Sequence, residues 1–205
     1  MLRISGSHIT QKFNRRNIFK DISFEVSNGS SLAISGPNGS GKTTLIRIIC
    51  RLIRPTTGSV IFRENQKEIP LQEFHGHLGL VGPYLQLYND LTALENYTFF
   101  TRIRGVKTNL SHFTRLMDRF GLKGREMDEL KNYSSGLLQR AKYVMALLHQ
   151  PQVLILDEPT SNLDEEGSEI VYSLMEEQKK DKILIFATNE PGELKYADEQ
   201  IHILS

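Results

Sequence analysis

One segment organises this chain: Gly36-Pro37-Asn38-Gly39-Ser40-Gly41-Lys42-Thr43-Thr44, directly after the apolar run Ser31–Ser35. Its pattern, G-x-x-x-x-G-K-T, joins a buried strand to a helix and surrounds phosphate groups with backbone N–H groups. The glycines let the backbone turn tightly enough for consecutive N–H groups to point inward. A glycine-rich turn can precede a helix without any ligand, but a strand, loop, lysine and threonine in register favour a nucleotide site.

Three side chains of this segment suit a bound polyphosphate. Lys42 is placed to reach the β- and γ-phosphates, and the Thr43 hydroxyl to bind Mg²⁺. Thr44 adds a further hydroxyl, and the helix that starts near Lys42 presents its positive N-terminal end. The sequence therefore predicts that the nucleotide is bound by Gly36, Pro37, Asn38, Gly39, Ser40, Gly41, Lys42, Thr43 and Thr44.

The composition suits one compact α/β domain, because 205 residues fall near the usual domain size. The net charge is +1, and no basic tail indicates a nucleic-acid partner. The single cysteine, Cys50, lies among apolar residues, which favours a buried side chain over a reactive thiol and fits a reducing cytoplasm. With no apolar signal region and no run of about 18 apolar residues, we expect a chain that neither spans a membrane nor carries an export signal.

Residues 2–34 are expected to form strands separated by turns. Leu2–Phe13 and Ile18–Val26 are the extended stretches, and Asn28-Gly29 is typical of a hairpin turn. A helix is predicted from Lys42 to Ile53, where Arg54-Pro55 stops it. Two further strands are predicted, at Ser59–Phe62 and Leu78–Val81.

Residues 84–150 have a different, mostly helical pattern. Thr92 followed three residues later by a glutamate is typical of a helix start. Leu110–Phe120 has apolar residues at helical spacing, and Ser134 or Ser135 opens a helix that runs to His149. We therefore expect one domain over residues 1–205, with a helical subdomain (84–150) inserted into an α/β core (1–83 and 151–205).

Two carboxylates follow the next strand. Val153–Leu156 is continuously apolar, as in a strand buried on both faces. Asp157 stands at its carboxyl end, where a carboxylate can hold Mg²⁺ directly or through water. Glu158 can position or deprotonate a water near the γ-phosphate. The alternative, two ordinary surface carboxylates, is disfavoured because a fully apolar strand precedes them.

Three segments together carry a family resemblance: Gly36–Thr44, Tyr133–Arg140 and Leu156–Asp164. Their order and spacing resemble those of an ABC-type ATPase over essentially the whole chain. The resemblance implies a P-loop NTPase core with a mostly parallel sheet, an N-terminal antiparallel β part and a helical insert. It also implies ATP and Mg²⁺ as cofactors, with two ATP-binding subunits paired head-to-tail and each ATP held between them.

Further roles follow from the resemblance alone. Ser134 and the backbone at Gly136 would contact the γ-phosphate of the opposite subunit's ATP, as a helix N-terminus can. Asp164 would bridge across the interface between the two subunits. Phe13 occupies the position of an adenine-stacking aromatic in this family, although an ordinary strand aromatic in the core is the alternative reading of its local sequence.

The chain departs from the family pattern at three places. Its signature segment has Tyr133, Ser135 and Leu137 where the family usually has Leu, Gly and Gln, although Ser135 keeps the backbone donor. Asn189 stands at the family's switch histidine, and asparagine cannot become cationic near neutral pH. The family's metal-contacting glutamine would fall near Pro83, which leaves Gln86 as the nearby candidate.

The resemblance implies an ATPase subunit that docks on a polytopic membrane partner at the inner face of the cell membrane. The compact size looks most like the subunits of export systems, including the haem-exporter ATPase of cytochrome c maturation. A soluble ABC-type clamp on nucleic acid or ribosomes is the alternative, but its usual coiled coils, basic extensions and second ATPase unit are not present in this sequence. A small-molecule P-loop kinase would leave Tyr133–Arg140 unexplained.

Overall fold

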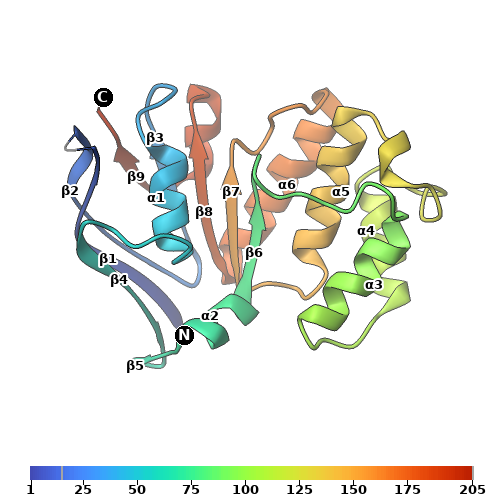
Figure 1. Ribbon diagram of the computed structural model, residues 1–205, viewed down its shortest axis with the longest axis horizontal. Coiled ribbons are helices and arrows are strands. Elements are labelled where there is room, and N and C mark those ends of the chain that lie inside the picture. Colours follow the sequence, from blue (N-terminus) through green and yellow to red (C-terminus); the bar gives the residue numbers. More distant parts are fainter. Residues whose placement is uncertain (15, 205) are drawn as a thin grey trace. The chain divides into compact units, whose positions relative to one another are not determined.

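The computed structural model describes residues 1–14 and 16–204, which fall into two compact units (Figure 1). The first unit comprises residues 1–78, 152–158 and the described chain from 175 onward. The second comprises Gly79–Pro151 and Pro159–Leu174. Helix α6 (Glu165–Asp181) contributes residues to both units.

An antiparallel sheet begins the first unit. Its order is β2-β1-β4-β5, formed by β1 (Leu2–Phe13), β2 (Arg16–Ser27), β4 (Thr57–Glu64) and β5 (Lys67–Glu68). Ile4 of β1 pairs with Val26 on one side and Phe62 on the other, and all three side chains are buried. The two extended stretches expected near the N-terminus are confirmed, because alternating apolar residues bury one face of each strand.

A parallel sheet forms the core of the first unit. The strands β7 (Val153–Asp157), β8 (Ile183–Thr188), β3 (Ser30–Ser35) and β9 (Glu199–His202) lie in this order. Every residue of β7 and β8 is buried, as their continuous apolar sequences predict. The predicted α/β class is confirmed. Parallel strands bring their carboxyl ends to one edge, so the residues following β3, β7 and β8 share that edge.

Helix α1 (Lys42–Ile49) packs against β7 and β8, between these strands and the antiparallel sheet (Figure 1). It ends before the predicted Ile53, because Arg51 adopts a left-handed backbone with φ of 53°. The Arg51 guanidinium donates to the Val60 carbonyl oxygen of β4 at 2.5 Å and lies 4.9 Å above the Phe62 ring. Burial raises the pKa of the Cys50 thiol to about 12, with a contribution from Asp157, which agrees with an unreactive cysteine.

A short helix that the sequence analysis did not predict, α2 (Leu71–His77), precedes strand β6 (Leu78–Val81). The Phe74 ring of α2 stacks on the Phe62 ring of β4, with centroids 3.4 Å apart and planes 7° apart. Both rings are completely buried. Arg51, Phe62 and Phe74 therefore form a continuous stack that joins the end of α1 to β4 and α2.

The second unit is helical. It contains α3 (Ala93–Ile103), α4 (Leu110–Arg119), α5 (Ser135–Leu147) and the short 3₁₀ helix η1 (Leu130–Asn132), while a second 3₁₀ helix, η2 (Pro191–Tyr196), belongs to the first unit. The predicted capping box at Thr92 is confirmed. Phe120 stacks on Tyr143 of α5, with ring centroids 5.4 Å apart. None of the helices within residues 1–14 and 16–204 has the length and apolarity required to cross a membrane.

Candidate functional site

The loop between β3 and α1 lies at the carboxyl edge of the parallel sheet. Gly36 and Gly41 have φ angles of 147° and 108°, which side-chain-bearing residues rarely adopt. A Cβ atom on Gly41 would also collide with the side chain of Ile18 in β2. The glycine spacing recognised in the sequence is therefore required by the backbone path of this loop.

Lys42 extends back into this loop from the first turn of α1. Its ammonium donates to the carbonyl oxygens of Gly36 at 2.9 Å and Pro37 at 3.3 Å, and it lies 3.4 Å from Oε1 of Glu158. Only 5% of Lys42 is exposed. A cation is thus held at the centre of a loop built from backbone groups, as phosphate binding requires.

Asp157, the last residue of β7, has a buried carboxylate beside the Thr43 hydroxyl. It is 2% exposed, and neither carboxylate oxygen has a hydrogen-bond partner among the described residues. Burial raises the pKa of Asp157, the nearby Thr43 hydroxyl opposes that rise, and the Glu158 charge adds to it. An orphaned buried carboxylate beside a threonine hydroxyl fits a hard divalent cation such as Mg²⁺, which takes oxygen ligands.

Glu158 and Phe13 line the same pocket of about 390 Å³ beside the phosphate loop, together with Ile18, Asn38, Gly39, Gly41, Lys42, Thr43 and Thr44. Glu158 has a left-handed backbone with φ of 55°, and its carboxylate faces Lys42. Phe13 is 51% exposed, so it does not pack in the core. It lines the pocket beside the phosphate loop, and its adenine-stacking role stays a prediction.

Asn189 follows β8 at this edge of the sheet. Its side-chain amide donates to Oδ1 of Asn38 in the phosphate loop at 3.3 Å. Asn189 is exposed and can therefore donate to a bound phosphate or water. The first unit thus brings together Phe13, the phosphate loop, Asp157, Glu158 and Asn189.

The remaining predicted site residues belong to the second unit. Ser134 caps α5, where its Oγ accepts from the Leu137 N–H at 3.3 Å. Ser134 and Ser135 are exposed, and Gly136 is half-buried. Gln86 is exposed in the segment between β6 and α3. The phosphate-contacting role of the first three residues and the metal-contacting role of Gln86 remain predictions.

Asp164 is held by Arg140, a residue whose role the sequence reasoning did not identify. Nη2 of Arg140 donates to Asp164 at 2.6 Å and to Glu166 at 3.0 Å, and Nη1 donates to the Phe120 carbonyl oxygen. The hydrogen bond from Arg140 and that from the Gly167 N–H lower the pKa of Asp164. An arginine within the mostly apolar sequence of α5 was the signal available, because a buried guanidinium needs acceptors.

Residues 19–161 match the family model described as "ABC transporter". An uncharacterized ABC transporter ATP-binding protein of Bacillus subtilis (strain 168), YdbJ, is 36% identical over 167 residues, which cover 82% of this chain and 53% of YdbJ. The lipoprotein-releasing system ATP-binding protein LolD of Bacteroides fragilis (strain YCH46) is 32% identical over 215 residues, covering 100% of this chain and 98% of LolD.

Solved structures agree with this fold. One reported as the structure of an ATP-binding subunit of an ABC transporter superposes with a TM-score of 0.83, covering 98% of this chain and 85% of the other at 24% identity. A putative ABC transporter ATP-binding protein from Pyrococcus furiosus also gives 0.83, covering 98% and 97% at 22% identity. The predicted family resemblance is confirmed: the chain belongs to the ABC transporter family, as an ATP-binding ATPase subunit of a membrane transporter.

Proposed function

We propose that this chain binds and hydrolyses MgATP in a head-to-tail pair of ATP-binding subunits and thereby powers an exporter. The central observation is the arrangement at one edge of the parallel sheet. Lys42 lies within the glycine loop, Glu158 faces it, and Asp157 beside them has two buried oxygens without donors among the described residues. A lysine ammonium inside the loop and a buried carboxylate next to it suit a metal-bound polyphosphate.

Each residue then has a defined task. Lys42 neutralises charge on the β- and γ-phosphates, while Phe13 stacks on the adenine. Thr43 and Asp157 would hold Mg²⁺, with Gln86 as a further proposed contact, and the metal would neutralise phosphate charge. Glu158 positions or deprotonates the attacking water, and Asn189 donates a hydrogen bond to the γ-phosphate or that water. Because Asn189 stays neutral, it supplies less charge stabilisation than a histidinium would.

The pair of subunits completes the site. Ser134, Ser135 and Gly136 at the start of α5 offer a hydroxyl and backbone donors to the γ-phosphate held by the other subunit. Asp164 contacts the partner across the interface. The second subunit is either another copy of this chain or a related one.

A polytopic membrane subunit at the cytoplasmic face of the membrane is the proposed third partner. The likeness to LolD, described as the ATP-binding protein of a lipoprotein-releasing system, supports extrusion as the direction of transport. The haem-exporter likeness remains a prediction about the substrate.

Glu158→Gln tests this proposal. The amide keeps the size of the side chain but cannot accept a proton, so ATP hydrolysis should fall at least about 100-fold, as expected when roughly 3 kcal/mol of transition-state stabilisation is lost. Size-exclusion chromatography with light scattering should show an ATP-dependent dimer. Glu165→Gln, an exposed glutamate at the start of α6, is the matched control and should retain activity.

A strictly monomeric Glu158→Gln protein at high protein and MgATP concentrations would contradict ATP-driven pairing. Purification from detergent-solubilised native membranes tests the partner. Stoichiometric recovery of a polytopic membrane protein supports the transporter, whereas recovery of ribosomes or nucleic-acid proteins in its place would support the soluble clamp.

A further inference from the structure

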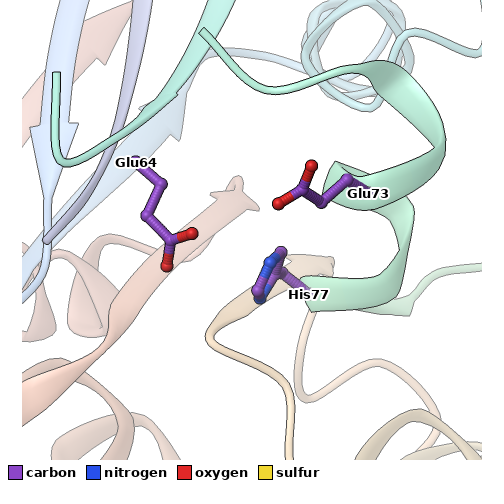
Figure 2. A group of neighbouring side chains, drawn as sticks. All are labelled: Glu64, Glu73 and His77. Atoms are coloured by element: carbon purple, nitrogen blue, oxygen red, sulfur yellow. The ribbon is translucent and has the colours of Figure 1, made fainter. Parts of the chain in front are cut away.

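Three potential metal ligands converge in the first unit, outside the proposed nucleotide site. They are Glu64 at the end of β4, and Glu73 and His77 on α2 (Figure 2). One ligand atom from each residue lies within 4.8 Å of those of the other two. Figure 2 shows the two carboxylates and the imidazole directed toward a common space between the strand and the helix.

The placement of these residues follows from the apolar packing beside them. Phe62 and Glu64 are two residues apart on β4 and therefore project from the same face. Glu73 and His77 are four residues apart on α2, which puts them on one side of that helix. The buried stack of Phe62 on Phe74 holds α2 against β4, so Glu64 faces Glu73 and His77 without needing contacts of their own.

Among the described residues, no ion pair neutralises the two carboxylates of this cluster. Among residues 1–14 and 16–204, no hydrogen bond or ion pair is formed by the side chains of Glu64, Glu73 or His77. Of the nearby cations, Lys67 of β5 lies opposite Glu64 in the strand register. Arg51 pairs instead with Glu68 at 3.9 Å and donates to the Val60 carbonyl oxygen. Two carboxylates held close together repel each other, and a divalent cation between them would remove that repulsion.

The donor set identifies the class of cation. Mg²⁺ and Ca²⁺ favour oxygen ligands throughout, whereas an imidazole nitrogen with carboxylates suits Zn²⁺ and neighbouring transition metals. Zinc bonds of about 2.0–2.2 Å place tetrahedral ligands about 3.4 Å apart. Because the three ligand atoms lie within 4.8 Å of one another, only a small contraction is needed. Rotation about the side-chain bonds of the two glutamates can provide that movement.

We propose that Glu64, Glu73 and His77 form a binding site for a divalent transition-metal ion, with Zn²⁺ as the preferred occupant. Three protein ligands leave at least one coordination position for water. The ion links β4 to α2 and therefore fixes the helix that leads directly into β6. This site is separate in composition from the Thr43 and Asp157 pair, which offers oxygen ligands only.

Calorimetric titration of the untagged, chelator-treated full chain with ZnCl₂, in excess Mg²⁺ and without nucleotide, tests the site. We expect one ion per chain in the wild type. His77→Asn and Glu73→Gln should each weaken Zn²⁺ binding at least about 10-fold. Removing a residue that only supports a metal ligand already costs about 10–100-fold in metal affinity. His8→Asn removes an exposed imidazole whose acidic neighbour is Asp21 and should leave the affinity unchanged.

Equal Zn²⁺ affinity in the wild type and His77→Asn overturns the proposal, as does loss of binding in His8→Asn with retention in His77→Asn. Melting temperatures of the metal-free variants report whether they are folded. A second measurement needs no variant: diffraction at the zinc absorption edge from wild-type crystals grown with zinc should show an anomalous peak between the three side chains. A peak only at other positions refutes the site.

Discussion

Asp157→Asn should stabilise the nucleotide-free protein while abolishing its activity. The wild-type carboxylate is 2% exposed, and its two oxygens lack hydrogen-bond donors among the described residues. An unsatisfied buried polar group costs about 1–3 kcal/mol, and more when charged. Lys42 and Thr43 offset part of this cost, so we expect a net gain of about 1–2 kcal/mol from the neutral amide. For a chain of this size, that corresponds to about 2–8 °C in melting temperature.

The pH dependence of this gain has a defined sign. Burial raises the pKa of Asp157 above its unfolded value, so the folded state is penalised at pH values above the raised pKa. The penalty disappears as the pH falls and the folded carboxyl is protonated. The advantage of Asp157→Asn should therefore be greatest near neutral pH and shrink toward acidic pH.

Differential scanning calorimetry in a chelating buffer, across a series of pH values, measures this effect. Asp198→Asn is the matched control, because Asp198 accepts hydrogen bonds from the Ser31 N–H at 2.8 Å and the Ser31 hydroxyl at 2.7 Å. That variant should lower the melting temperature. A lower melting temperature for Asp157→Asn, or an advantage that grows toward acidic pH, would refute the reasoning. ATP hydrolysis with Mg²⁺ should fall about 100-fold or more in Asp157→Asn if a metal contact worth about 3 kcal/mol is lost.

Three further predictions concern the proposed catalytic cycle. Phe13→Ala should raise the KM for ATP about 5- to 150-fold with little change in kcat, because base stacking contributes about 1–3 kcal/mol. Phe13→Tyr should behave as the wild type, and equal KM values in all three proteins would exclude stacking. Asn189→His should increase the steady-state hydrolysis rate about 10-fold, since an added charge-assisted contact is worth about 1.5 kcal/mol, and an unchanged or lower rate contradicts the role given to Asn189. Arg140→Gln should return the pKa of Asp164 upward toward its ordinary value, because the Arg140 hydrogen bond is the main cause of the lowering; NMR titration of the Asp164 carboxyl measures this, and an unchanged pKa would refute the cause.

The elements predicted correctly were those specified by local patterns. The phosphate loop is fixed by glycines whose positive φ angles are required, and β7 by an apolar run long enough for a buried strand. Helix α2 carries no comparable signal: its N-cap is Pro70, without a side-chain cap, and it contains Gly76, a poor helix former. It is stabilised instead by Phe74 packing on a strand residue distant in sequence, which no local pattern records.

The same distinction holds at the candidate site. The end of the strand at Asp157 and Glu158 could be predicted from the sequence, because the apolar run ends there. The left-handed backbone of Glu158 and the lack of donors around Asp157 depend on tertiary packing and were not predictable. The hydrogen bond from Arg140 to Asp164 was likewise not predictable, because it depends on contact between α5 and the loop before α6 in the second unit.

The stack of Arg51, Phe62 and Phe74 has a consequence for the cooperativity of local unfolding. A helix as short as α2, with Gly76 inside it, would fray readily if it were independent. Here its opening must also expose two completely buried rings and break the hydrogen bond from His75 Nε2 in α2 to the Cys50 carbonyl oxygen at the end of α1. Transient opening of α2 is therefore coupled energetically to the helix that carries Lys42, and the two helices belong to one cooperative unfolding unit.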